Sequence, residues 1–145
     1  MPSDATRSPS VAERLLWASL AAGGFAVLVT AAWIEPDPRG YGTHTQLGLP
    51  PCGFLALTGS PCPGCGLTTA FAYAARGQWW LAGTSNPLGL VLFLIVCATV
   101  PMSVLAIVRG WSFAATVDRL SLDRWALAVA GCGVVLWVVR FASAL

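Results

Sequence analysis

Residues 15–34 read LLWASLAAGGFAVLVTAAWI, a run of twenty residues without a single charged side chain. As an α-helix, a run of this length extends about 30 Å, which is the thickness of the hydrocarbon core of a bilayer. A cleaved signal peptide has a shorter apolar core, of about 7 to 15 residues, so the run is typical of a retained membrane anchor. The sequence therefore predicts a first transmembrane helix at residues 15–34.

Two further apolar runs occur later in the chain. Residues 87–108 read PLGLVLFLIVCATVPMSVLAIV, and residues 125–145 form a third run that only Arg140 interrupts. Backbone groups inside a bilayer must find their hydrogen bonds within the chain, so each run is expected to be helical. The alternating ten-residue segments of a membrane barrel are not present in the sequence. We therefore expect an all-α integral membrane protein with three transmembrane helices.

The composition is typical of a membrane protein and argues against several classes of function. Of the 145 residues, 57% are hydrophobic and 10% are charged, whereas soluble domains contain about 25% charged residues. The eight basic residues are all arginines and do not cluster, so nucleic-acid binding is not expected. The lack of lysine excludes lysine Schiff-base and P-loop chemistry, and a single histidine leaves little for acid–base catalysis. We therefore do not expect an ordinary hydrolase.

The spans divide one membrane domain, residues 1–145, into six segments. They are an N-terminal tail (1–14), the first span (15–34), a cysteine-bearing loop (35–86), the second span (87–108), a loop (109–124) and the third span (125–145). Within the cysteine-bearing loop, Leu67–Ala75 can be helical but is too short to cross a bilayer, and Trp79 and Trp80 follow it. Because indole rings favour the headgroup layer, we expect a short interfacial helix here. A buried connector helix is the alternative.

The arginine distribution predicts the orientation, because cytoplasmic segments near span ends carry an excess of basic residues. With a cytoplasmic N-terminus, five arginines lie inside and three outside; the inner ones are Arg7, Arg14, Arg109, Arg119 and Arg124, and the outer ones are Arg39, Arg76 and Arg140. This count places the cysteine-bearing loop on the external side.

Small and sulfur-containing residues also occur within the spans. Alanines recur every four residues on the first span (18, 22 and 26) and on the third (126 and 130). Such faces allow close packing of helices, although alanine is also simply common in transmembrane segments. Beyond the lipid bilayer, the expected partners are therefore another membrane protein or a second copy of the chain. Cys97 and Cys132, which lie within spans, are expected to be small buried hydrophobic residues.

Residues 51–69 read PCGFLALTGSPCPGCGLTT and hold three of the five cysteines. Cys62 and Cys65 form a CxxC motif just before the expected helix, where backbone N–H groups stabilise a thiolate. Cys52 lies ten positions earlier, and the only histidine, His44, lies eight before that. Three thiols and one imidazole are the ligand set of a Cys3His zinc site. Glu35 or Asp37 could replace the histidine.

Two other interpretations of these cysteines remain open. In an oxidising compartment, two of them would form a disulfide and leave the third free, and a cycling Cys62–Cys65 pair would serve thiol exchange. Loop entropy assigns about 1.9 kcal/mol to a Cys62–Cys65 bridge and about 2.8 kcal/mol to a Cys52–Cys62 bridge. A structural zinc site contributes roughly 10 to 16 kcal/mol. A metal ion would therefore stabilise the loop more than a disulfide, whereas an oxidising external compartment favours the disulfide.

Four short sequence elements lie around the cysteines. They are a cysteine followed by Leu-Thr-Gly, a CPxCGxT core, an Arg-Gly pair, and an asparagine before the next span. Here they are Cys52, Leu57, Thr58, Gly59, Cys62, Pro63, Cys65, Gly66, Thr68, Arg76, Gly77 and Asn86. Over about residues 36–90, the chain thereby resembles a family of small bacterial membrane proteins called domain-of-unknown-function family 2752. Many relatives have arginine after the threonine of the core, where this chain has Thr69.

The resemblance implies a bacterial inner-membrane protein and supplies no reaction. Apart from the cysteines, the motif residues are expected to be structural, and Thr68 is expected to cap the helix that follows the core. We expect an accessory or scaffold protein with a cysteine-stapled loop. The alternatives are a zinc-binding membrane protein and a membrane thiol–disulfide oxidoreductase, for which the sequence shows no quinone or haem ligand set.

Overall fold

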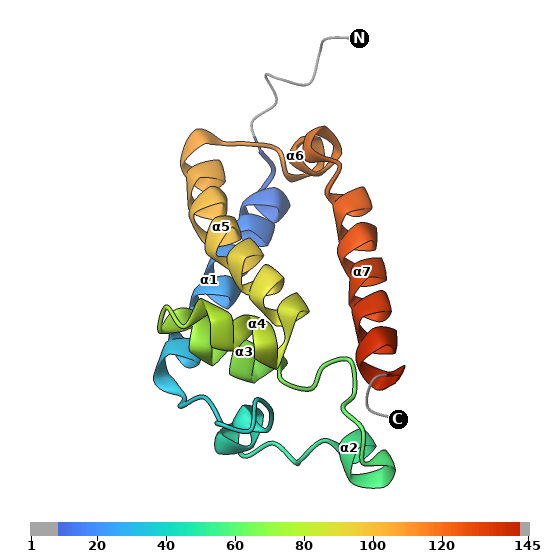
Figure 1. Cartoon of the computed structure of the whole chain (residues 1–145). Coiled ribbons are helices and arrows are strands. Elements are labelled where there is room, and N and C mark those ends of the chain that lie inside the picture. Colours follow the sequence, from blue (N-terminus) through green and yellow to red (C-terminus); the bar gives the residue numbers. More distant parts are fainter. Residues whose placement is uncertain (1–8, 143–145) are drawn as a thin grey trace.

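The computed structural model describes residues 9–142 and consists of helices and connecting loops (Figure 1). The elements in chain order are α1 (Val11–Trp33), the 3-10 helix η1 (Thr43–Leu47), α2 (Gly53–Thr58), α3 (Leu67–Ala75), α4 (Trp79–Ser85), α5 (Pro87–Arg109), α6 (Phe113–Leu120) and α7 (Leu122–Ala142). No strand occurs among the described residues. The all-α prediction is confirmed.

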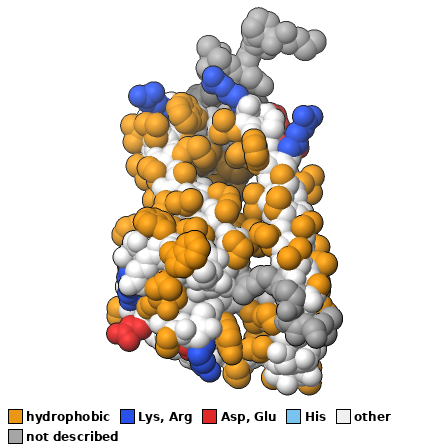
Figure 2. Space-filling view, viewed as in Figure 1, with side chains coloured by type: hydrophobic (Ala, Val, Ile, Leu, Met, Phe, Trp, Pro, Cys, Tyr) orange, Lys and Arg blue, Asp and Glu red, His pale blue; other side chains and the backbone are white. Residues whose placement is uncertain are grey.

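Helices α1, α5 and α7 are long and apolar enough to cross a membrane. No more than 17% of the residues in their apolar windows are buried inside the protein. Figure 2 shows that hydrophobic side chains cover the middle of the molecule, whereas charged side chains gather at its two ends. An apolar outer surface is what a lipid environment requires, so the protein is a three-span membrane protein.

Helices α1 and α7 begin earlier than the predicted first and third spans, and helix capping explains the difference at α1. Ser10 and Glu13 form a capping box: the Ser10 hydroxyl accepts from the Glu13 N–H at 3.2 Å, and the Ser10 N–H donates to Glu13 Oε2 at 2.9 Å. Helix α1 therefore starts at Val11 and takes in the last four residues of the predicted tail. Residues 1–8, including Arg7, and the side chain of Arg140 lie outside the part that the structure describes.

The predicted loop at 109–124 contains helix α6, and contacts from α1 hold its first turn. Glu13 Oε1 accepts from the Ser112 hydroxyl at 2.6 Å and from the Phe113 N–H at 3.1 Å. A carboxylate at a helix N-terminus is favourable, because the first N–H groups of a helix lack partners. The Trp17 indole adds an edge-to-face contact with the Phe113 ring at 5.0 Å. The segment between the second and third spans thus contains a helix of eight residues.

Helix α3 forms over the predicted residues and becomes the centre of the core. Residues 69–74 are all buried, and the helix packs against α1, α4 and α5. The Phe71 and Phe93 rings meet edge to face at 5.5 Å between α3 and α5. This is the buried connector helix that the sequence left as the alternative. Trp79 and Trp80, which follow it, are exposed, and their position in the headgroup layer stays a prediction.

The alanine repeats of the spans are not covered by other helices of this chain, and their contact with a partner helix stays a prediction. All five alanines of the two repeats are exposed. Instead, α1 approaches α5 at Gly24, where an added Cβ would lie 2.7 Å from Val100 Cγ2. Cys97 and Cys132 are exposed as well, so their prediction as buried residues was wrong. The physical reason is that lipid tails are as apolar as a protein interior, so a residue within a span need not be covered by another helix.

Candidate cysteine centre

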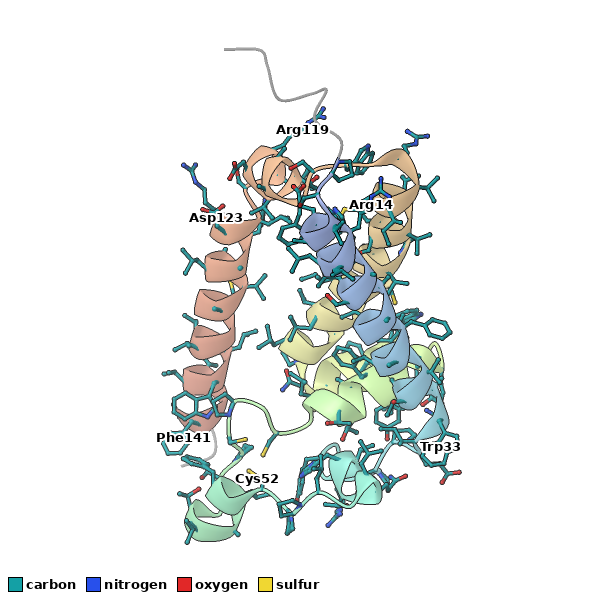
Figure 3. All side chains as sticks on the ribbon, turned by 180° about the vertical axis from the view of Figure 1, so that it is seen from behind. Arg14, Trp33, Cys52, Arg119, Asp123 and Phe141 are labelled. Atoms are coloured by element: carbon teal, nitrogen blue, oxygen red, sulfur yellow. The ribbon has the colours of Figure 1, made fainter. Side chains whose placement is uncertain are left out.

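Three cysteines from two segments of the chain meet at one end of the molecule. Cys52 precedes α2, Cys62 lies in the following loop and Cys65 lies just before α3; their Sγ atoms are all within 4.8 Å of one another. Figure 3 shows Cys52 at the same end as Trp33 and Phe141, opposite Arg14, Arg119 and Asp123. All three are free thiols in this structure. We refer to Cys52, Cys62 and Cys65 together as the cysteine centre.

A tight turn brings the two cysteines of the CxxC motif together. The Cys65 N–H donates to the Cys62 carbonyl at 3.0 Å, and the Leu67 N–H donates to the Gly64 carbonyl at 3.1 Å. Gly66 then adopts a left-handed backbone conformation with φ of 85°, and α3 starts directly after it. Residues 62–66 are called the CPGC turn below. The motif therefore ends at a helix start, as the sequence predicts.

Gly66 lies where the CPGC turn meets two other loops. A Cβ at this position would be 2.6 Å from the Ser85 carbonyl oxygen and 2.7 Å from the Gly40 carbonyl oxygen. Only glycine combines the left-handed conformation with this close approach of backbone. The predicted structural role of Gly66 thus has a specific cause, which is the contact with residues 40 and 85.

Asn86 joins the CPGC turn to the second span. Its side chain is buried; Nδ2 donates to the Cys65 carbonyl at 3.0 Å and to the Pro63 carbonyl at 3.3 Å. Its Oδ1 accepts from the Gly89 N–H at 3.0 Å and caps α5. One side chain therefore sets the position of the turn and the start of a transmembrane helix.

The end of α7 covers the cysteine centre from the other side. The Trp137 indole N–H donates to the Pro61 carbonyl at 3.2 Å, and the Trp137 ring meets the Phe54 ring edge to face at 6.4 Å. A cavity of about 10 Å³ between this tryptophan, Cys62 and Asn86 has room for no more than one water molecule. Trp137 is 76 residues from Pro61 in the chain, and no local sequence signal indicates this contact.

The structure brings together three of the four predicted metal ligands and leaves His44 apart. His44 lies on η1, and its Nε2 donates to the Pro50 carbonyl at 3.1 Å. Neither Glu35 nor Asp37 joins the cysteines. The Asp37 carboxylate instead binds the Arg39 guanidinium at 2.6 Å, and this hydrogen bond lowers the pKa of Asp37 to about 2. Within the described residues, the ligand group contains cysteines alone.

Residues 52–100 match a family model described as protein of unknown function (DUF2752). This segment belongs to that family. The DUF2752 segment runs from Cys52 into α5, so it includes the whole cysteine centre and Asn86 but neither His44 nor Trp137. No curated protein and no solved structure matches the chain.

Two other polar residues of the DUF2752 segment support the fold around the centre. One Arg76 Nη1 donates to the Ala72 carbonyl at 2.9 Å and to the Ala31 carbonyl at 3.2 Å, so it joins the ends of α3 and α1. The Thr69 hydroxyl lies 2.8 Å from that of Thr43 and anchors η1 on α3. Thr68 does not cap α3, because Gly66 occupies the N-cap position and makes no side-chain bond. The predicted cap was therefore wrong.

Gly59 and Pro63, the remaining motif residues of the segment, shape its backbone. Gly59 ends α2 in a left-handed conformation, and its N–H donates to the Leu55 carbonyl at 2.9 Å. Pro63 offers its carbonyl to Asn86. Both residues therefore have structural roles, because they fix the course of the backbone around the cysteines.

The environments of Cys52 and Cys65 differ. The Leu55 N–H, followed by the Cys62 and Cys65 thiols, lowers the pKa of the Cys52 thiol. Burial, followed by the Cys62 thiol, raises the pKa of Cys65 to about 12. In the metal-free protein at neutral pH, Cys65 is therefore a neutral thiol and Cys52 is the more readily ionised group. A thiophilic cation would ionise coordinating thiols outright.

A larger cavity of about 310 Å³ lies between α1 and α3, away from the cysteines. Its lining is apolar apart from the hydroxyls of Thr30 and Thr68. Neither hydroxyl is accompanied by a base or a second nucleophile in that lining. The chemical groups of this chain are thus concentrated in the cysteine centre.

Proposed function

We propose that the protein is a noncatalytic accessory or scaffold protein of a bacterial cytoplasmic membrane, whose cysteine centre acts as a clasp that closes the loop at residues 52–65. The meeting of Cys52 with the two thiols of the CPGC turn carries this proposal. The polar groups around them support it, because Asn86 and Trp137 use their donors to hold the loop backbone. Such bonds position a loop.

The space beside the cysteines also supports a structural role. Apolar side chains from α5 and α7, those of Leu88, Leu136 and Trp137, line the adjoining cavity. A substrate larger than water does not fit there, since small-molecule sites occupy about 300 to 1,000 Å³. A centre that rests on such an apolar wall is suited to holding chain segments together.

Exposed faces of the spans are the proposed binding surfaces. Lipid covers most of them, and the small alanine faces of α1 and α7 suit close contact with a helix of another membrane protein or of a second copy. Helix α7 supports this because only 6% of its apolar window is buried within the chain. The clasp would then hold the end of α7 in the position that such a partner requires.

The proposed orientation places the N-terminus in the cytoplasm and the cysteine centre outside. In intact cells treated with a reductant and a chelator, we expect a membrane-impermeant maleimide to label Cys52. The lowered pKa of Cys52 raises its thiolate fraction at pH 7, whereas Cys65, with a pKa of about 12, should react slowly. Mass spectrometry would identify the labelled residue. Labelling of Cys52 only after lysis would reverse the orientation.

Loss of the clasp is expected to destabilise the protein. The Cys62→Ser and Cys65→Ser variants should each lose at least about 2 kcal/mol, the lower limit set by a short crosslink. Matched controls are Cys97→Ser and Cys132→Ser, whose thiols are exposed and should change stability by less than about 0.5 kcal/mol. Thermal unfolding in detergent and the amount accumulated in membranes measure both. Cys62 and Cys65 variants as stable as the parent, yet inactive in complementation, would favour thiol exchange instead.

A further inference from the structure

We propose that Cys52, Cys62 and Cys65 bind one thiophilic cation, Zn²⁺ or Cu⁺, through three sulfur atoms, without His44 and with any further coordination position left to an outside ligand. This inference rests on the proposed function, since it names the chemistry of the clasp. Thiolates are the protein ligands that select zinc and copper(I). The sequence alone predicts a closed Cys3His site, and the structure replaces it with a three-sulfur site.

The sulfur positions suit a shared ion better than a disulfide. Sulfur atoms bound to one zinc ion at about 2.3 Å in a tetrahedral arrangement lie about 3.8 Å apart. The three Sγ atoms here are within 4.8 Å of one another. Side-chain rotations that move the sulfur atoms by about 1 Å would complete the site. A disulfide joins only two sulfurs, at about 2.05 Å, and gives no reason for the third to be present.

The backbone holds the sulfurs before any ion binds. The Cys65 N–H bonds the Cys62 carbonyl, and Asn86 bonds the Cys65 carbonyl. Such bonds fix the direction of a ligand and raise the affinity of a metal site. Cys52 and Cys62 are partly exposed while Cys65 is buried, so an ion can enter from the solvent side and rest against an apolar wall.

Two of the three residues that could supply a fourth donor, His44 and Asp37, have other partners, and Glu35 lies outside the cysteine group. His44 Nε2 bonds the Pro50 carbonyl, and the Asp37 carboxylate bonds Arg39. Zinc held by three protein ligands accepts water or another exogenous ligand at its fourth position. A zinc-loaded centre should therefore bind small added ligands, which a closed four-ligand site would exclude.

The full-length protein in detergent, reduced and freed of metal, allows a test that needs no variant. One equivalent of Zn²⁺, or of Cu⁺ supplied from a chelated stock, should protect Cys52, Cys62 and Cys65 from maleimide. Cys97 and Cys132 lie within spans that detergent covers, so they should react slowly with or without the ion. With Co²⁺ in place of zinc, a sulfur-to-cobalt charge-transfer band should appear, and added imidazole should shift the visible bands. Protection by either ion supports the site, and metal analysis of the protein as isolated from cells identifies the native cation.

Variants sharpen the assignment. Cys52→Ser, Cys62→Ser and Cys65→Ser should each weaken binding at least about 100-fold, because each removes a ligand. His44→Ala should leave the affinity within about twofold, and the double variant Cys97→Ser with Cys132→Ser serves as the control with matched chemistry. Loss of metal on His44→Ala would overturn the three-sulfur site. Failure of both ions to protect the thiols, or a disulfide within the centre of the freshly isolated protein, would overturn metal binding itself.

The stability measurements separate this inference from the proposed function. If no metal binds but the Cys62 and Cys65 variants still lose stability, the metal site is refuted and the clasp stands as a crosslink. If one equivalent binds but those variants are as stable as the parent, the metal site stands and the clasp is refuted.

Discussion

The Gly66→Ala variant is expected to lose about 3 kcal/mol of folding stability and to accumulate poorly in membranes. The left-handed conformation at this residue, with φ of 85°, costs an alanine about 1 kcal/mol. The new Cβ would lie 2.6 Å and 2.7 Å from the carbonyl oxygens of Ser85 and Gly40. Both are backbone atoms that cannot rotate away, so we expect a further cost of about 1 to 3 kcal/mol, which is typical of overpacking.

Gly77→Ala is the matched control for this variant. Gly77 has a similar φ of 73°, but nothing lies within 4 Å of the position that its Cβ would take. This variant should therefore lose only about 1 kcal/mol, the conformational part of the cost. Thermal unfolding of both proteins in the same detergent gives the comparison. Equal losses would show that the close approach at Gly66 does not contribute to the fold.

The Asn86→Ala variant should show a loss of similar size, about 3 kcal/mol, for a different reason. The substitution removes the N-cap of α5, which is typically worth about 1 kcal/mol. It also leaves the Gly89 N–H and the carbonyls of Pro63 and Cys65 without their partner in a buried place. Unsatisfied buried groups cost about 1 to 3 kcal/mol each, and partial access of water reduces the sum. Differential scanning fluorimetry in detergent would measure the loss.

Two further variants separate the cap from the contact with the CPGC turn. Asn86→Asp keeps an oxygen for the Gly89 N–H but turns a carboxylate toward two carbonyl oxygens, so it should be no more stable than the alanine variant. Ser10→Ala removes the exposed cap of α1 and should cost only about 1 kcal/mol. An Asn86→Asp protein as stable as the parent would mean that donation to the turn is unimportant.

Predictions that depend on local patterns agree with the structure. The three spans follow from the length and apolarity of their runs, and α3 occupies the predicted Leu67–Ala75 because glycine and proline bound an apolar segment there. The short helices α2 and α6 were not predicted. Helix α2 lies in a stretch rich in glycine and proline, and α6 depends on a carboxylate from α1, Glu13, that bonds its first turn. A helix of this length is stable only with tertiary support.

For the candidate site, too, local spacing predicts some contacts and the fold decides the others. The CxxC spacing indicates that Cys62 and Cys65 are neighbours, because four residues make a single turn. Cys52 and His44 are both far enough from that motif in the chain for a flexible segment to bring either one back to the turn. The sequence therefore predicts both as further ligands. The chain path decides between them: η1, anchored through Thr43 on Thr69, directs His44 to Pro50, while the start of α2 brings Cys52 to the centre.

By itself, the sequence determined that this is an all-helical membrane protein with three spans and that its reactive groups are concentrated in one loop. Hydrophobic length and residue chemistry are local properties, and a bilayer acts on each run separately. Only the tertiary structure decided which residues meet: three cysteines without the histidine, Gly66 against Ser85, and Trp137 over the loop. Such contacts join segments far apart in the chain, and their formation depends on close packing and on satisfying buried polar groups across the whole fold.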